Sequence, residues 1–241
     1  MNLSFPPVSL LVDASLFLDL DGTLIEFADR PDAIEVGEPL RDLLRALIVK
    51  FNGRVAVISG RSLSDLSDRL AIADLSAAGS HGLESRRSVG RVERFPVPEG
   101  LAAVIAEACD YARRHDLVAE PKPSGIALHF RSDPAAEAGA VALFDRLASR
   151  HGLIVQRGAM VVELRPPGPD KGSIVRQFMA EPPFSAGSPV VVGDDLTDED
   201  AFAAGLALGG TGILVGADRP TAARFRLPSV SAVRQWLRSA L

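Results

Sequence analysis

The chain has 241 residues, of which 47% are apolar and 24% charged, and its formal net charge is −5. This length and composition suffice for the buried core of one domain or of two small ones, and they exclude a low-complexity chain. An acidic chain without a basic block argues against a nucleic-acid-binding surface or an anionic-membrane surface. The single cysteine, Cys109, excludes an internal disulfide and a cysteine-based metal cluster and is typical of a reducing compartment.

The N-terminal segment lacks the basic region and the cleavage site of a secretory signal. The longest uncharged run, residues 201–217, is too short and too rich in glycine to span a membrane. We therefore expect a cytoplasmic protein without a membrane partner.

The first part of the chain alternates strand and helix patterns. The apolar run 15–20 predicts a buried strand and is followed by a polar loop through Asp29, Arg30, Pro31 and Asp32. A helix is predicted over 39–50, a strand over 54–58, a helix with Ser62 as its N-cap, and a strand over 76–79. This alternation predicts a right-handed parallel sheet.

The pattern changes after the third strand. Residues 83–95 resemble two short strands that meet near Val89 and Gly90, and the proline-rich run 95–100 breaks the composition. Helices are predicted over 101–114 and, with Asp133 as N-cap, over 134–150. Strand patterns lie at 117–120, 125–130, 153–156 and 160–165, which together predict an inserted α+β module.

The parallel pattern then resumes. Residues 166–169 mark the return crossing, and the following elements are a helix over 171–179, strands over 190–192 and 211–215, and helices over 197–204 and 230–241. Trp236 is expected in the core. The predicted fold is α/β: a Rossmann-like parallel-sheet core formed by residues 1–82 and 167–241, interrupted by an α+β domain at 83–166.

Polar side chains gather where parallel strands end, which is the edge where open α/β sheets bind ligands. Four segments reach this edge: Asp19 to Thr23, Ser59 to Arg61, Lys171 at a helix start, and Gly193 to Asp200. Together they supply carboxylates, a hydroxyl and two cations. This mixture suits a phosphate ester and Mg²⁺, which prefers oxygen ligands.

The residue types suggest a division of labour. Asp19 is our candidate nucleophile, because a carboxylate attacks phosphorus without first losing a proton, provided that a metal and Lys171 offset the repulsion. Asp21 is the candidate acid and base. Each residue alone has an ordinary alternative: a turn at a strand end for Asp19 and Asp21, helix capping for one of Asp194, Asp195 and Asp198, and chain punctuation for Ser59.

These segments in this order resemble the four motifs of haloacid-dehalogenase-type (HAD) phosphatases, and the insert resembles their C2-type cap. Several further stretches are similar to trehalose-6-phosphate phosphatases, and the similarity spans nearly the full chain. They are Ile58 to Arg61, Ser80 to Glu84, Glu120 to Lys122, Ala127 to Arg131, Val161 to Pro166 and Gly193 to Glu199.

The resemblance implies an enzyme that hydrolyses trehalose 6-phosphate to trehalose and phosphate with Mg²⁺, through an aspartyl-phosphate. It implies that Asp19 and Asp194 bind the metal through their side chains and Asp21 through its carbonyl, and that Asp195 and Asp198 support this site from behind. It also implies catalytic roles for Ser59 and Lys171. The implied substrate-binding residues are Leu20, Gly60, Arg61 and His81 in the core and Glu120, Lys122 and Glu163 in the cap.

Some questions stay open at this point. The family often has a lysine where this chain has Ala159, which leaves the substrate open. The alternatives are a sucrose-phosphate or mannosylglycerate-phosphate phosphatase and a phosphomutase of the phosphomannomutase type. A non-catalytic sugar-phosphate-binding module is a further alternative, against which the presence of Asp19, Asp21, Lys171 and Asp194 together counts. His81 is either a hinge residue or a neighbour of the site, whereas His115, His129 and His151 lack metal-ligand spacing and are interpreted as structural. The resemblance also leaves open a functional pairing with a trehalose-6-phosphate synthase.

Overall fold

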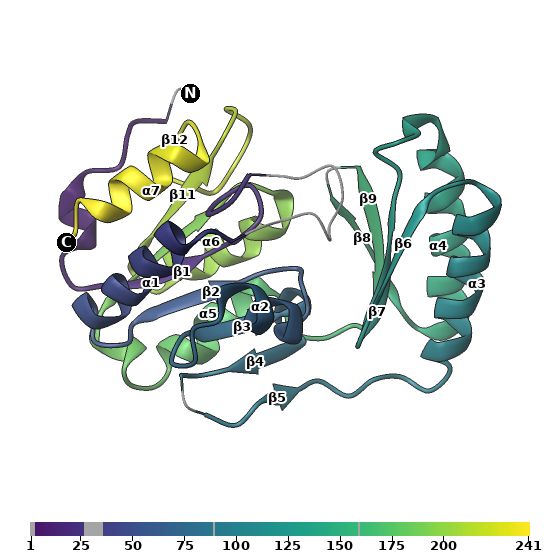
Figure 1. Cartoon of the computed structure of the whole chain (residues 1–241), viewed down its shortest axis with the longest axis horizontal. Coiled ribbons are helices and arrows are strands. Elements are labelled where there is room, and N and C mark those ends of the chain that lie inside the picture. Colours follow the sequence, from purple (N-terminus) through teal and green to yellow (C-terminus); the bar gives the residue numbers. More distant parts are fainter. Residues whose placement is uncertain (1–2, 27–35, 89, 159) are drawn as a thin grey trace. The chain divides into compact units, whose positions relative to one another are not determined.

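A computed structural model describes residues 3–26, 36–88, 90–158 and 160–241 of the chain (Figure 1). The chain forms two compact units: Met1–Arg94 together with Pro169–Leu241, which we call the core, and Phe95–Gly168, which we call the insert. The polar loop expected at Asp29 to Asp32, the turn residue Val89 and the family-specific position Ala159 lie outside the described residues.

The core contains an eight-stranded sheet in the order β12-β11-β10-β1-β2-β3-β4-β5. The strands from β12 to β3 are parallel, and β4 and β5 are antiparallel to their neighbours. This confirms the α/β class. The bounds are β1 (Ala14–Leu18), β2 (Val55–Ile58), β3 (Ser76–Gly79), β4 (Glu84–Arg86), β5 (Glu93–Arg94), β10 (Ser188–Gly193), β11 (Thr211–Val215) and β12 (Phe225–Leu227).

Both faces of the core sheet are buried, because alternate side chains of the central strand β1 enter different clusters. Leu16 and Leu18 pack with the helices on one face, and Phe17 packs with Phe178 and Phe184 on the other. Trp236 lies in the first cluster, as predicted. The helices are α1 (Glu38–Lys50), α2 (Leu63–Leu70) and α7 (Val230–Arg238) on the first face, and α5 (Lys171–Met179) and α6 (Glu199–Ala207) on the second.

The insert is an α+β unit with its own core. Its antiparallel sheet has the order β6-β7-β9-β8, and one face packs against two helices through one hydrophobic cluster. The ends of the insert meet: a Cβ added to Gly168 would lie 2.9 Å from the ring of Phe95. The bounds are α3 (Leu101–Arg114), β6 (Val118–Lys122), β7 (Gly125–His129), α4 (Glu137–His151), β8 (Ile154–Gly158) and β9 (Val161–Arg165).

The structure differs from the predicted organisation at the first crossing into the insert. Residues 83–94 belong to the core, because β4 pairs with β3 and β5 pairs with β4. The return crossing lies at Gly168 and Pro169, close to the expected position. The strand pattern changes after residue 82, which predicts the boundary there, but the pattern does not reveal which strand β4 pairs with.

Smaller differences concern helix starts and one short strand. The helices expected at Pro134 and Thr197 begin as short 3₁₀ turns, Pro134–Ala136 and Leu196–Asp198, before α4 and α6. Strand β12 was missed because it has three residues and only Leu227 is fully buried. In the part of the chain that the structure describes, no helix is long and apolar enough to cross a membrane.

Candidate active site at the carboxyl edge of the core sheet

Three neighbouring parallel strands deliver the predicted residues to one edge of the core sheet. Asp19 follows β1, Ser59 follows β2 and Asp194 follows β10, and β1 lies between the other two. The main-chain N–H of Asp19 donates to the carbonyl of Val192 at 2.9 Å, so the pairing of β1 with β10 extends to the site. The strand topology therefore determines that these three residues lie at the same edge of the sheet.

A tight turn separates the two carboxylates of the first segment. The carbonyl of Leu20 accepts bonds from the N–H groups of Leu24 and Ile25 at 2.8 and 2.9 Å. Gly22 has a φ of 79°, a conformation that glycine adopts without steric cost. Because the chain has begun to turn at Leu20, Asp21 does not continue the strand direction of Asp19.

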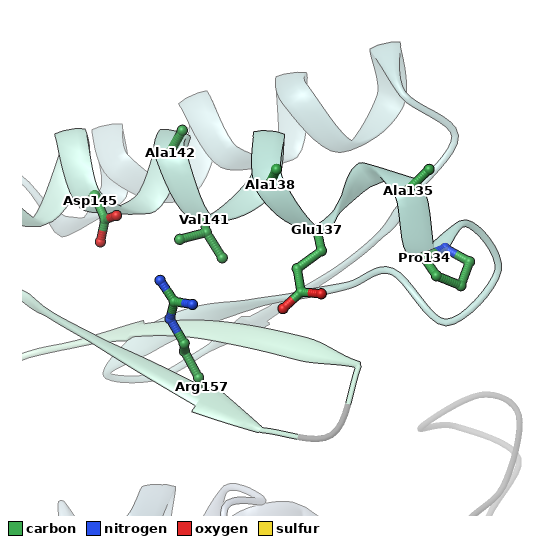
Figure 2. Close-up of a pocket in the computed structure, with 8 residues that line it drawn as sticks. All are labelled: Pro134, Ala135, Glu137, Ala138, Val141, Ala142, Asp145 and Arg157. Carbon is green, nitrogen blue, oxygen red and sulfur yellow. The ribbon is translucent and has the colours of Figure 1, made fainter.

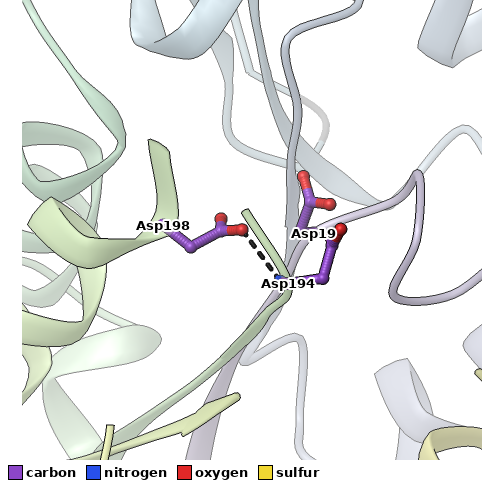
Figure 3. Close-up of side chains that lie close together, drawn as sticks. All are labelled: Asp19, Asp194 and Asp198. Carbon is purple, nitrogen blue, oxygen red and sulfur yellow. Dashed lines mark hydrogen bonds between the residues drawn. The ribbon is translucent and has the colours of Figure 1, made fainter. Parts of the chain in front are cut away.

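Three carboxylates converge at this edge, those of Asp19, Asp194 and Asp198 (Figure 3). One oxygen from each lies within 4.8 Å of the others. Asp198 approaches so closely that a Cβ at Gly193 would lie 2.2 Å from its carboxyl carbon, which explains the glycine before the two aspartates. Carboxylate oxygens at this separation suit a hard divalent cation.

Lys171 partly compensates this negative charge. Its Nζ donates to Asp19 Oδ1 at 2.7 Å and to Asp198 Oδ1 at 2.6 Å, and its side chain is buried. Burial alone would lower the pKa of the ammonium, but the two carboxylates outweigh it and raise this pKa. Lys171 reaches this position because α5 begins there, capped by Asp170, whose Oδ1 accepts from the Ser173 N–H at 2.6 Å.

Two of the carboxylates have raised pKa values. Burial raises the pKa of Asp19 well above its ordinary value, although Lys171 opposes this. Burial and the charge of Asp198 raise the pKa of Asp194 to about 7, against a hydrogen bond from Thr23 Oγ1 at 3.1 Å. Three carboxylates with one ammonium leave an excess of negative charge, so a bound cation would relieve the site.

Asp198 and Asp195, expected to support the site from behind, hold its main chain and its lysine in different ways. Asp198 belongs to the three-carboxylate cluster, and its Oδ2 also accepts the N–H groups of Asp194 and Asp195, both at 3.0 Å. Asp195 lies outside the cluster and caps the following 3₁₀ turn, with its side chain accepting from the Leu196 N–H at 2.6 Å. The capping alternative considered for this segment thus applies to Asp195.

Asp21 does not join the cluster through its carboxylate, which is paired with an arginine instead. Arg61 donates from Nε and Nη2 to the two oxygens of Asp21 at 2.7 and 2.8 Å. Its Nη1 donates to Asp65 at 2.8 Å, and the side chain is largely buried. A fork-to-fork pair of this kind is strong and directional.

The remaining predicted core residues lie in the loops after β1 and β2 and in the short turn Ser80–Gly82 after β3. Ser59 Oγ accepts from the main chain of Arg61 at 3.1 Å, and the Ser59 carbonyl accepts from His81 N–H at 3.0 Å. The His81 ring lies against Gly60, where a Cβ would be 2.6 Å from Nε2. The side chain of Leu20 is fully buried. His81 is therefore a neighbour of the loop that follows β2.

The predicted insert residues share the sheet face that the helices do not cover. Glu120 and Glu163 both lie opposite Ala127 in the strand register, whereas Ile126 and Leu128 face the hydrophobic cluster. Lys122 Nζ donates to Glu163 Oε2 at 2.6 Å. The strand pairing thus places the three predicted residues of the insert together.

His129, interpreted as structural from sequence, contacts one of these residues. Its Nε2 lies 2.8 Å from Glu120 Oε2. Burial raises the pKa of Glu120, but the hydrogen bond with His129 and the charge of Lys122 outweigh it and lower this pKa. The contact runs between paired strands, so only the register reveals it.

A separate hollow of about 580 Å³ lies on the insert between α4 and β8 (Figure 2). Arg157 of β8 points toward α4, on the side where Glu137 and Asp145 lie. The hollow is wide open, and its lining includes none of the predicted site residues. This hollow is therefore not part of the candidate active site at the edge of the core sheet.

Comparison with known proteins agrees with this architecture. The C-terminal domain of the Candida albicans trehalose-6-phosphate phosphatase aligns with a TM-score of 0.85 at 20% identity, covering 99% of this chain and 97% of that one. A haloacid-dehalogenase-like hydrolase from B. subtilis aligns with a TM-score of 0.64 at 14% identity, covering 95% and 100%. At these identities the likeness shows the fold, which is that of HAD-like hydrolases.

Sequence similarity identifies the family. The chain is 35% identical over 229 residues to the trehalose-6-phosphate phosphatase of Escherichia coli (strain K12), covering 92% of this chain and 84% of that protein. Residues 17–231 match the family model described as trehalose-phosphatase. The chain belongs to the trehalose-phosphatase family.

Proposed function

We propose that the protein is a Mg²⁺-dependent phosphatase that hydrolyses trehalose 6-phosphate to trehalose and phosphate. One observation carries the proposal: a buried lysine contacts Asp19 and Asp198 beside Asp194, at the carboxyl edge of a parallel sheet. Family membership supports the substrate. Such an enzyme draws its substrate from a trehalose-6-phosphate synthase, so a functional pairing with that activity is part of the proposal.

The donor set fits Mg²⁺. We assign Asp19 and Asp194 as side-chain ligands and Asp21 as a main-chain ligand, with Asp198 beside them and Asp195 holding the following turn. Burial and neighbouring carboxylates raise the pKa of Asp19 and of Asp194, so a nearby cation would favour their ionised forms. A bound Mg²⁺ would supply this positive charge and offset the repulsion between the carboxylates and the phosphate.

The first chemical step uses Asp19. Its carboxylate oxygen attacks phosphorus while the bond from phosphorus to the sugar oxygen breaks, and Asp21 gives its proton to that oxygen. Lys171 holds Asp19 in place and stabilises charge on the transferring group, to which Ser59, Leu20 and Gly60 also bind.

Hydrolysis of the aspartyl-phosphate completes the cycle. Asp21 takes a proton from water, the water oxygen attacks phosphorus, and the Asp19 carboxylate leaves. Arg61 donates to both oxygens of Asp21, at 2.7 and 2.8 Å, so it has to give up one of these two bonds when Asp21 carries the proton. We therefore place Arg61, with its neighbour His81, at the substrate side of the loops.

The insert is proposed as the cap that selects the sugar. Glu120, Lys122 and Glu163 lie on the sheet face opposite the insert's helices, and charged groups form strong, directional hydrogen bonds with sugar hydroxyls. Lys122 Nζ donates to Glu163 Oε2 at 2.6 Å, and His129 Nε2 lies 2.8 Å from Glu120 Oε2. These contacts hold the carboxylates in place, and the pKa of Glu120 is lowered by its hydrogen bond with His129 and by the charge of Lys122, against the effect of burial.

The experiment is phosphate release from a panel of esters, with Mg²⁺ and with excess chelator. The panel contains trehalose 6-phosphate, sucrose 6-phosphate, mannose 6-phosphate and an aryl phosphate. We expect trehalose 6-phosphate to have the highest kcat/KM and chelator to abolish turnover. A higher kcat/KM for another sugar phosphate would overturn the substrate assignment, and full activity in chelator would overturn the metal assignment.

A further inference from the structure

A loop after β11 holds the segment that carries Asp194. Arg219 in this loop donates from Nη2 to the main-chain carbonyl of Asp195 at 2.8 Å and to that of Asp194 at 3.3 Å. The contacts join residues more than twenty positions apart in sequence, and no motif of the sequence includes Arg219. They bring a guanidinium to the main chain that carries the Asp194 carboxylate.

Arg219 is itself fixed by Glu199, the first residue of α6. Glu199 Oε1 pairs with Arg219 Nη1 and accepts from Thr221 Oγ1 at 2.8 Å, while Oε2 accepts from the Ala222 N–H at 2.8 Å. Arg219 and Glu199 are both about three-quarters shielded from solvent, with side-chain exposures of 23% and 26%. The guanidinium therefore has a defined position rather than a free surface orientation.

The main chain of Asp194 and Asp195 is held through both its N–H groups and its carbonyls. Asp198 accepts the N–H groups of these two residues, and Arg219 donates to their carbonyls. Four main-chain polar groups are thus bonded to side chains, which leaves the backbone little freedom to rotate. Because the Asp194 carboxylate is attached to this backbone, its position depends on both contacts.

We infer that Arg219 is a positioning residue that fixes the main chain of Asp194 and Asp195 and so orients the Asp194 carboxylate toward a divalent cation. The inference rests on the proposed function, in which Asp194 is a metal ligand. Glu199 neutralises the guanidinium, so Arg219 acts through geometry rather than through its charge. Outer contacts of this kind typically alter metal affinity by about 10- to 100-fold.

The test measures Mg²⁺ affinity directly, by titration calorimetry, in the wild-type protein and in Arg219→Met, which removes the donors but keeps an unbranched stem. We expect about tenfold weaker Mg²⁺ binding, with partial recovery in Arg219→Lys. The matched control is Arg226→Met, because Arg226 donates from Nη1 to the Gly216 carbonyl at 2.6 Å in the same region but does not touch the Asp194 segment. It should keep wild-type affinity.

Catalysis supplies a second readout. At saturating Mg²⁺, Arg219→Met should hydrolyse an aryl phosphate with a near wild-type KM, and the loss should appear as a higher Mg²⁺ concentration for half-activation. Should Arg219→Met not fold, Glu199→Gln replaces it: Arg219 stays but loses its ionic partner, and a smaller loss of Mg²⁺ affinity is expected.

Unchanged Mg²⁺ affinity in folded Arg219→Met, or an equal loss in Arg226→Met, would overturn the inference. If the wild-type protein binds Mg²⁺ and hydrolyses trehalose 6-phosphate in that experiment, the proposed function survives this outcome. If the wild-type protein does neither, the proposed function fails, and the inference fails with it.

Discussion

Replacing a proposed metal ligand should stabilise the metal-free protein. In Asp194→Asn the buried carboxylate becomes a neutral amide of the same shape, whose oxygen can still accept the Thr23 hydroxyl. The pKa of Asp194 is raised from its ordinary 3.8 to about 7, so ionisation of this group is unfavourable in the folded protein. The substitution removes that cost.

The sign and size of this change in stability follow from the linkage between proton binding and folding. A raised folded-state pKa gives stability that is complete below the unfolded value and is lost as pH rises through about 7. Three pKa units at 1.36 kcal/mol each set a ceiling of about 4 kcal/mol. Solvent reaches part of Asp194 and the neighbouring side chains relax, so we expect Asp194→Asn to be more stable by about 1 to 3 kcal/mol at pH 8, and by less at pH 5.

The assay is urea unfolding with chelator at both pH values. Trp236 is the single tryptophan and is buried in the core, so its fluorescence reports unfolding of the unit that carries the site. With saturating Mg²⁺ the order should reverse, because ligand binding stabilises only the wild-type protein strongly.

The control for this prediction is Asp195→Asn. Asp195 caps a 3₁₀ turn outside the cluster, and asparagine caps equally well. Its charge is the smallest of the effects that raise the pKa of Asp194, so this variant should show a much smaller pH-dependent gain. Equal pH profiles for the two variants, or a metal-free Asp194→Asn that is less stable than wild type at pH 8, would refute the electrostatic reasoning.

Three further substitutions test the assigned roles. Asp19→Asn should lower phosphate release by about 10³-fold or more with native circular dichroism; appreciable turnover would remove Asp19 as the nucleophile. Glu163→Ala should lower kcat/KM for trehalose 6-phosphate by about 10- to 150-fold, the worth of a charged hydrogen bond, and leave an aryl phosphate nearly unaffected; equal losses on both substrates would contradict its role in sugar binding. Lys171→Met should destabilise the metal-free protein by about 3 to 5 kcal/mol at pH 8, because it leaves buried carboxylates without their ammonium; urea unfolding measures this, and a neutral result would mean that the cluster is solvated.

The fold could be predicted where the burial of a strand leaves a recognisable pattern in the local sequence. The run that includes Leu16, Phe17 and Leu18 is apolar at every position because β1 is covered on both faces, and this marks a central parallel strand. Strand β4 was recognised as a strand, but its assignment to the insert was wrong, since a three-residue pattern does not tell which sheet it joins. Pairing partners depend on the assembled sheet.

The site was predictable to the extent that topology alone determines it. Strand ends bring Asp19 and Asp194 together in any parallel sheet of this order. The entry of Asp198 into the cluster depends on the 3₁₀ turn before α6, and the pair between Asp21 and Arg61 depends on side-chain rotamers across two loops. Such contacts have no signature in residue spacing.

The meeting of Phe95 and Gly168 has a consequence for how the chain assembles. Strand β1 pairs with β10, which lies beyond the insert in sequence, so the core sheet cannot close until that distant segment arrives. An unfolded insert would be a long loop to close, and each doubling of such a loop costs about 0.6 kcal/mol. Once the insert has folded around its own hydrophobic cluster, its two ends are adjacent. The folded insert then joins the two parts of the core as a short loop would. The insert can therefore be exchanged for another folded module, or replaced with a short linker, without raising the entropic cost of pairing β1 with β10.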